Sequence, residues 1–230
     1  MGEESHRRQA CPAVKRCRVL VEGTTEEIFV NQTLRPHLLQ HQFIDVQPVK
    51  VETSRLKGGG KFGGGSTTWA SLDHQLRTHC QDSSALITMM FDFYAFPNVP
   101  GLAPNPSNPR HAVEALQERI SALIGASNFV PFVMLHEFEA LLFVDPKLVA
   151  SYAGDQKIEG LLSRDVQQSG EPELIDSGPQ SAPSKRIRKH WPRYAKGTDG
   201  PAIASQVGLP RLRAGCPHFD RWVSALEALH

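Results

Sequence analysis

Glu22 and Asp92 each stand directly after a segment with the character of a buried strand. Cys17 to Val21 is short and valine-rich, and Ala85 to Phe91 is the most convincing buried strand in the sequence. Ligands bind beyond the carboxyl ends of the strands in open parallel sheets, so residues at these positions are the first candidates for chemistry. If the two segments are neighbouring strands, the two carboxylates converge. Converging carboxylates favour a hard divalent cation, and we expect Mg²⁺, with Mn²⁺ as the alternative.

A second acidic pair lies in the segment HEFEALLF, residues 136–143, which follows another strand-like run. We expect Glu137 and Glu139 at the same edge of the sheet, Glu137 as a catalytic group and Glu139 as a metal ligand. One of them could instead be a buried acid paired with an Arg of the C-terminal segment. His136 and Glu137 begin like a zinc-binding HExxH helix, but the second histidine is missing, which excludes that site. We expect His136 to orient a carboxylate, a phosphate or a water.

The densest basic stretch of the chain lies between residues 185 and 196, and Trp191 and Tyr194 lie inside it. Basic side chains that contact phosphates, together with aromatic rings that stack on bases, are typical of sequence-tolerant binding to single strands or RNA. A solvated face, or ion pairs across a domain interface, is the alternative. The candidate nucleic-acid-binding residues are Lys185, Arg186, Arg188, Lys189, Arg193 and Lys196.

The elements that must position these residues alternate between strand-like and helical segments. The predicted strands are 17–21, 43–51, 85–91 and 129–135, and helical periodicity begins near residues 24, 69, 112 and 136. This order predicts an α/β fold with a parallel sheet covered by helices on both faces.

The chain divides into three predicted parts. They are a disordered leader over 1–15, an α/β domain over 16–150, and a mainly helical or irregular C-terminal extension over 151–230 that packs on it. The extension is richer in Gly, Pro, Ser and charge. Near its end, four apolar residues at helical spacing are predicted to be core, and they are Phe219, Trp222, Leu226 and Leu229.

Composition narrows the class of protein without identifying it. The 25 Lys and Arg residues balance 24 Asp and Glu, so a nucleic-acid contact must come from a local concentration of charge. The four cysteines lack CxxC spacing, which predicts reduced thiols in a cytoplasmic protein, and no stretch is apolar enough to cross a membrane. The glycine-rich segment Lys57 to Ser66 lacks phosphate-loop spacing and is predicted to be a linker or a mobile lid.

The segments VEGTTEE and FDFY, which contain Glu22 and Asp92, resemble the two signature elements of the Toprim fold. That family includes topoisomerases, primases and overcoming-lysogenization-type nucleases. The resemblance implies a metal ligand or general acid/base at Glu22, a metal ligand at Asp92, and a tight turn at Gly23. Toprim proteins usually carry an Asp-x-Asp pair, whereas this chain has Tyr94 at the second position. The candidates for a replacement ligand are Glu26, Asp82 and the later acids.

A closer resemblance covers most of the chain and includes HEFEALLF, APSKRI at 182–187, the pair Tyr194 and Lys196, and CPHFDRW at 216–222. These segments look like a bacterial Toprim-like family that is often encoded beside an ATPase and suspected in phage defence. The resemblance implies a Mg²⁺-dependent nuclease acting on DNA or RNA with an ATPase partner, and it leaves a homodimer open. A non-catalytic module that binds an ATPase or nucleic acid is the alternative, and phosphoryl transfer to a small nucleotide is a third hypothesis.

Overall fold

A parallel β-sheet forms the centre of the protein, with strand order β2-β1-β3-β4. The computed structural model describes residues 15–52, 67–94, 96–102, 108–175, 178 and 180–228. The strands are β1 (Lys15–Val21), β2 (Phe43–Lys50), β3 (Ala85–Asp92), β4 (Phe129–Val130) and β5 (Val133–Met134). All of their pairings are parallel, which confirms the predicted sheet.

The register of the sheet brings its carboxyl ends to one edge. Val21 at the end of β1 pairs with Met90 of β3 on one side and with Lys50 of β2 on the other. Asp92 at the end of β3 pairs with Met134 of β5. The residues that follow these strands therefore emerge together, although they are far apart in the sequence.

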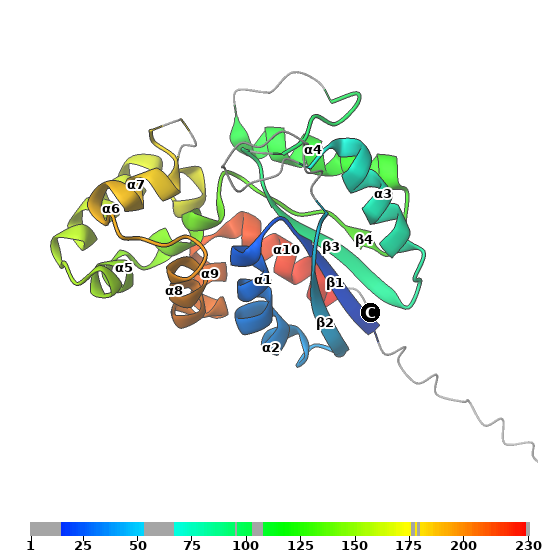
Figure 1. The fold of residues 1–230 in the computed structure, drawn as a ribbon, viewed down its shortest axis with the longest axis horizontal. Coiled ribbons are helices and arrows are strands. Elements are labelled where there is room, and N and C mark those ends of the chain that lie inside the picture. The colour runs from blue at the N-terminus through cyan, green and yellow to red at the C-terminus, as the bar shows by residue number, and fades with distance from the viewer. Residues whose placement is uncertain are drawn as a thin grey trace, which may run out of the picture.

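Helices cover both faces of the sheet (Figure 1). Figure 1 shows α3 and α4 on one side of the strands and α1, α2 and α10 on the other. The helices and helical turns are α1 (Thr24–Phe29), η1 (Val30–Leu34, π-helical), α2 (Arg35–Leu38), α3 (Trp69–Cys80), α4 (Pro109–Ile124), η2 (Phe138–Val144, 3₁₀), α5 (Pro146–Ala153), α6 (Lys157–Ser169), η3 (Pro172–Leu174, 3₁₀), α7 (Pro183–His190), α8 (Asp199–Val207), α9 (Leu209–Gly215) and α10 (Pro217–Ala228).

Alternation along the strands divides the core into two layers. In β1, Val19 and Val21 belong to the layer that contains Phe29 of α1, whereas Leu20 belongs to the layer under α3 and α4. Side chains of a strand point alternately to the two faces, so one apolar strand supplies both layers. The sheet is thus buried on both faces, as the strand-like runs predicted.

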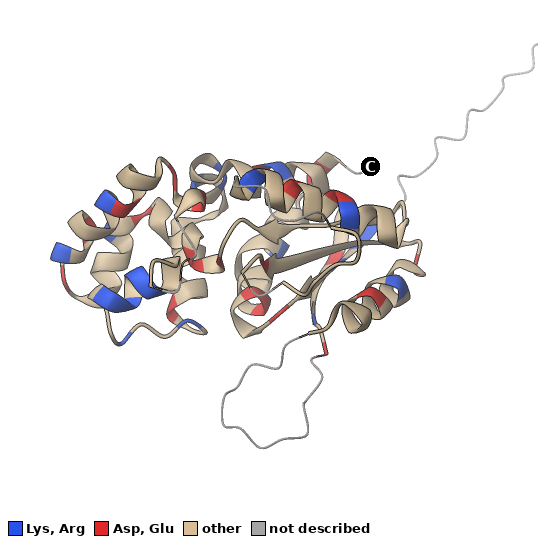
Figure 2. Ribbon diagram, turned by 90° about the horizontal axis from the view of Figure 1, so that it is seen from above, with Lys and Arg blue, Asp and Glu red and all other residues tan. Residues whose placement is uncertain are grey.

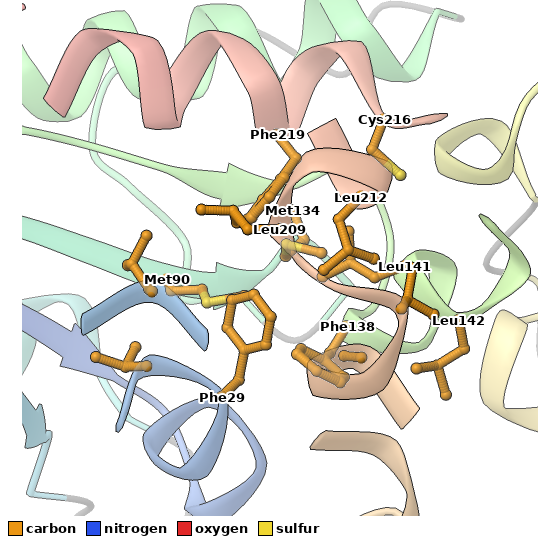
Figure 3. Packing of buried hydrophobic residues seen from close by; sticks show 14 of the residues in the cluster. Phe29, Met90, Met134, Phe138, Leu141, Leu142, Leu209, Leu212, Cys216 and Phe219 are labelled. Carbon is orange, nitrogen blue, oxygen red and sulfur yellow. The ribbon is translucent and has the colours of Figure 1, made fainter. Parts of the chain in front are cut away.

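The C-terminal part shares the first of these layers (Figure 3). Phe29 of α1 makes edge contacts with Phe138 of η2 and Phe219 of α10, at centroid distances of 5.4 and 6.0 Å. Figure 1 shows α5 to α9 beside the sheet, while α10 returns along it. The prediction that Phe219, Trp222 and Leu226 are core is confirmed, because all three are buried.

Two predicted elements differ in detail from the observed ones. The single strand predicted over 129–135 is interrupted at Pro131 into β4 and β5, because proline lacks the N–H that a ladder needs. The helix predicted to begin at His136 is the 3₁₀ segment η2, which starts at Phe138 and whose residues are almost all buried.

Several predictions fall on residues outside the described ranges. They concern residues 1–14 of the leader, the glycine-rich segment 57–66, and Leu229. Lys15, the last residue of the predicted leader, is the first residue of β1. Among the described helices, none combines the length and apolar character needed to cross a membrane.

Candidate active site

Glu22 lies at the rim of the sheet, one residue beyond β1, and its side chain is exposed to solvent. The chain then enters α1, whose first turn contains Glu26. Gly23 N–H donates to Glu26 Oε2 at 3.1 Å, so the Glu26 carboxylate caps its own helix. Gly23 has an extended backbone with φ −149°, and a Cβ there would lie 3.3 Å from Glu26 Oε2. Glycine at this position leaves room for a carboxylate in the two-residue connection between β1 and α1.

Asp92 is held by two groups from later parts of the chain. Its Oδ1 accepts a hydrogen bond from the backbone N–H of Phe138 at 2.9 Å. Its Oδ2 lies 3.3 Å from the ammonium of Lys196. With a 13% exposed side chain, Asp92 is nearly withdrawn from solvent but still faces the edge of the sheet. Its orientation is fixed before any ligand arrives.

Lys196 also pairs with Glu139, whose side chain is fully buried. The distance from Lys196 Nζ to Glu139 Oε2 is 3.0 Å. Tyr194 Oη donates to the other oxygen, Oε1, at 3.3 Å. A Cβ at Gly200 would lie 2.8 Å from Tyr194 Oη, so a glycine in α8 makes space for this hydroxyl. The buried acid predicted as one alternative for this pair is therefore observed, with Lys196 as its partner in place of an Arg.

Glu137 approaches the same place from the start of η2. Its Oε2 accepts a hydrogen bond from the backbone N–H of Ser184, in the first turn of α7, at 2.9 Å. Burial is the main cause of the raised pKa values of Asp92 and Glu139, and the negative charge of Glu137 adds to both shifts. Glu137 therefore lies close to both acids. We call the five acids Glu22, Glu26, Asp92, Glu137 and Glu139 the acidic cluster.

Burial and mutual repulsion raise the pKa values of Glu22, Glu26, Asp92 and Glu139. Burial raises the pKa of Glu26 to about 7, and the charge of Asp92 adds to the effect. Burial likewise raises the pKa of Glu139 to about 7, although Lys196 opposes the shift. The pKa of Asp92 is raised by burial above its usual range, against the effects of Lys196 and the Phe138 N–H.

Glu22 and Lys196 complete the electrostatics of the site. The surrounding protein raises the pKa of Glu22 to about 7, first by desolvation and then through Asp92. Because Glu22 is exposed, water screens this shift more than those of Glu26 and Glu139. Burial alone would lower the pKa of Lys196, but Asp92 and Glu139 outweigh it and the pKa lies above its usual range. Lys196 is therefore a permanent ammonium beside acids whose pKa values are raised.

The acidic cluster fits a hard divalent cation. Five carboxylates face one ammonium, so full ionisation leaves an excess of negative charge that a cation would relieve. Carboxylate oxygens are the ligands that Mg²⁺ prefers, and one or two suffice because the ion keeps several waters. Within the described ranges, the one set of three potential metal ligands whose atoms all lie within 4.8 Å of each other is elsewhere, at His37, His41 and Glu227. The acidic cluster therefore suits an ion held by few carboxylates.

The predicted nucleic-acid-binding residues do not form one group. Lys196 lies in the acidic cluster, and Arg186 is paired with Asp165 at 2.5 Å. Tyr194 is buried, so it cannot stack on a base, while Trp191 is half-buried. Figure 2 shows Lys and Arg positions on the helical part formed by α5 to α9. The candidates that remain exposed are Lys185, Arg188, Lys189 and Arg193.

Three further residues named from the sequence are Asp82, Tyr94 and His136, and Asp82 lies away from the acidic cluster. Asp82 precedes β3 and pairs with Arg18 at 2.7 Å, at the amino edge of the sheet, so it cannot replace the missing second aspartate. Tyr94 follows β3 but is 64% exposed. His136 is buried just after β5, and its predicted role in orienting a carboxylate, phosphate or water stays a prediction.

Sequence reasoning assigned Lys196 to nucleic acid and did not foresee it among the acids. Its position in a basic stretch concealed its contacts, which join residues 104 positions apart. The pair Tyr194 and Lys196, part of the resemblance noted above, was the one available signal, because both side chains converge on Glu139.

The sheet and its flanking helices define an α/β protein consistent with a Toprim-like fold, with a helical C-terminal part and an acidic cluster at the carboxyl edge. The chain belongs to the family DUF4276, described as a domain of unknown function, whose model matches residues 21–227. Among curated proteins, no match was found.

The chain is also similar to two solved structures of the C-terminal region of the OLD protein from Xanthomonas campestris pv. campestris. One, phased with mercury, has a TM-score of 0.41 and 12% identity, with 91% of this chain and 96% of that chain covered. The other, phased with iodine, has a TM-score of 0.39 and 15% identity, with 93% and 98% covered.

Proposed function

We propose that this protein is a Mg²⁺-dependent nuclease that hydrolyses phosphodiester bonds of DNA or RNA at the acidic cluster. The observation that carries the proposal is the convergence of acids from the ends of two strands and from η2 at one edge of the sheet. Glu22 follows β1, Asp92 ends β3 and Glu139 lies in η2, and the last two share the ammonium of Lys196. The resemblance of VEGTTEE and FDFY to the Toprim signatures supports the same reading.

Each residue of the cluster has a role that its surroundings favour. Asp92 and Glu139 would hold the cation with Glu22, since the Phe138 N–H and the Tyr194 hydroxyl fix their carboxylates. When bound, Mg²⁺ polarises a phosphate and makes a water more acidic. Glu22, which is exposed and whose pKa its surroundings raise, would be either a ligand of the ion or the general acid/base. Glu137 is a second candidate acid/base beside Asp92.

The exposed basic side chains of α7 and the following turn would contact the nucleic-acid backbone. Ser184 in the first turn of α7 is bonded to Glu137, so this helix begins at the acidic cluster. A strand bound along α7 could thus reach the cluster. As the resemblance implies, we further propose that the nuclease acts with an ATPase encoded beside it in defence against phage.

The direct test is cleavage by purified protein, alone and with the ATPase, of plasmid DNA, single-stranded DNA and RNA. We expect cleavage with Mg²⁺ or Mn²⁺ that EDTA abolishes. Glu22→Gln and Asp92→Asn should each reduce it by about 100-fold or more, the usual contribution of one positioned group. Glu27→Gln is the matched control, because Glu27 pairs with Lys50 at 2.6 Å outside the cluster. No cleavage of any substrate under these conditions, or full activity of Glu22→Gln, would contradict the proposal.

A non-catalytic module that binds an ATPase or nucleic acid is the second candidate. The observation that favours it is the pairing of Lys196 with Asp92 and Glu139, which neutralises part of the cluster without a metal. In that case Glu22→Gln leaves cellular function intact, whereas reversal of charge at Lys185, Arg188 and Lys189 abolishes partner binding.

A further inference from the structure

A second group of potential metal ligands lies at the amino edge of the sheet, away from the acidic cluster. His37 belongs to α2, and His41 follows α2 shortly before β2 begins at Phe43. Glu227 belongs to α10, near the other end of the described chain. The ligand atoms of these three side chains all lie within 4.8 Å of one another. Two imidazoles and one carboxylate are thus brought together from segments about 190 positions apart.

The distances in this group suit a tetrahedral ion after small movements. His37 Nε2 lies 2.5 Å and His41 Nε2 lies 3.8 Å from Glu227 Oε1. Ligands about 2.0–2.1 Å from a tetrahedral Zn²⁺ are roughly 3.3 Å from each other. The distance from His37 to Glu227 must therefore lengthen and that from His41 to Glu227 must shorten, each by less than about 1 Å. The two histidine rings already lie side by side, with centroids 4.5 Å apart.

Arg213 fixes the carboxylate that would bind the ion. It donates to Glu227 Oε1 at 2.5 Å and to Oε2 at 3.1 Å. It also donates to Asp220 Oδ1 at 2.5 Å and to Ser224 Oγ at 2.9 Å, so Asp220 offsets part of its charge. Glu227 Oε1 has a second lone pair, which now faces His37. Such outer partners are typical of metal sites, where they orient the ligands.

The ligand atoms of this group favour one kind of ion, and the exposure of the histidines allows that ion to enter. Imidazole suits Zn²⁺ and other late first-row ions, whereas Mg²⁺ prefers oxygen ligands. The side chains of His37 and His41 are 24% and 42% exposed, and that of Glu227 is 19% exposed. Solvent therefore reaches the histidine side of the group while the carboxylate side is packed.

We propose that His37, His41 and Glu227 form a Zn²⁺ site, with water in the fourth position, that ties α2 to α10. Binding would replace the hydrogen bond between His37 and Glu227 with metal bonds, and the Nε2 proton of His37 would move to Nδ1 or to solvent. Because the site joins elements near both ends of the described chain, bound zinc would favour the folded state. The site is independent of the nuclease proposal.

Zinc affinity is measured by competition with a chromophoric chelator, on full-length protein stripped of metal and kept in excess Mg²⁺ to occupy the acidic cluster. We expect one strong site in the wild type and a loss of affinity of about 10-fold or more in His41→Gln. His74→Gln is the control, because His74 is an exposed histidine of α3 outside the group. All variants keep their cysteines, so any binding by thiols is common to them.

Thermal unfolding separates a metal site from a plain ion pair. A 100-fold excess of Zn²⁺ over its dissociation constant should raise the unfolding temperature of the wild type by roughly 5 °C or more. His41→Gln should unfold near the wild-type temperature without zinc, since His41 is 3.8 Å from Glu227, and should gain little with it. Equal zinc affinity and equal stabilisation in the wild type and His41→Gln would overturn the proposal.

Discussion

The ammonium of Lys196 offsets part of the negative charge of the acidic cluster. Its ammonium contacts Asp92 and Glu139, and its backbone carbonyl accepts a hydrogen bond from Thr25 of α1 at 3.4 Å. A buried carboxylate without a partner is costly, because neither water nor a counter-charge stabilises its ionised form. The cluster can therefore hold several acids at once because one cation lies among them.

We predict that Lys196→Met destabilises the protein by about 3–5 kcal/mol at pH 8, the usual cost of breaking a buried pair. The loss should be smaller near pH 5.5. The raised pKa values of Asp92 and Glu139 mean that the folded state keeps protons that the unfolded state releases. Their contribution to stability is therefore present below the ordinary acid pKa and is lost as pH rises through the raised pKa values, of which that of Glu139 is about 7. Urea unfolding at both pH values measures the difference.

Lys50→Met is the matched control for this experiment. Lys50 pairs with Glu27 near the same edge of the sheet, but its side chain is 46% exposed. An exposed pair contributes less than about 1 kcal/mol, with little change between the two pH values.

Mg²⁺ should restore part of the stability of Lys196→Met at pH 8. A loss in Lys196→Met that is the same at both pH values would show that repulsion in the cluster is not its cause.

Residues of the candidate site were predictable from the sequence where they directly follow strands. Those that reach the candidate site from a distant part of the chain were not predictable. Glu22 and Asp92 could be placed because strands β1 and β3 have strong apolar runs that end at them. Lys196 could not, since its contacts depend on how α7 and α8 pack on η2 and α1. No local periodicity encodes that packing, so a lysine bound to buried acids looks like any other member of a basic stretch.

At the scale of elements, α10 is attached to the sheet by a buried polar link. Trp222 Nε1 donates to Thr88 Oγ1 at 2.9 Å, and this hydroxyl donates to the carbonyl of Val130 at 2.6 Å. The first turn of α10 is held separately, because Glu173 accepts hydrogen bonds from the backbone N–H groups of His218 and Phe219 at 2.8 and 2.9 Å. The last described helix is therefore fixed both at its start and in its middle.

We predict that Thr88→Val lowers the free energy of unfolding by about 1–3 kcal/mol, because it leaves the buried Trp222 N–H without an acceptor. Thr88→Ser keeps the hydroxyl and should cost less. The double variant Thr88→Val, Trp222→Phe should cost less than the sum of the single variants, since the unsatisfied donor is then gone. Strict additivity of the two changes, measured by urea unfolding, would argue against the link.

The elements themselves were largely predictable, and the exceptions have local causes. Strands β1, β2 and β3 and helices α3, α4 and α10 match the apolar periodicity, since burial on one face or on both dictates the pattern. The run 129–135 looked like one strand because its apolar residues are continuous, but Pro131 divides it. The helical start at His136 was misplaced because a segment that is buried on nearly all sides has no periodic face.

At the scale of the whole molecule, the C-terminal part completes both the core and the site. Phe219 and Trp222 of α10 lie in the same core layer as Phe29 of α1. Tyr194 and Lys196 come from the turn between α7 and α8 and reach Glu139 in η2. A domain limited to residues 16–150 would lack these contacts, so we expect the activity to require the C-terminal extension.

Anomalous diffraction from crystals soaked in Mn²⁺ tests the central claim most directly, because it locates the ion without assuming any activity. We predict an anomalous peak at the carboxyl edge of the sheet, with oxygens of Glu22 and Asp92 among its ligands, and no such peak in Asp92→Asn. A Mn²⁺ peak bound elsewhere, with Glu22 and Asp92 pointing away from each other, would contradict the account.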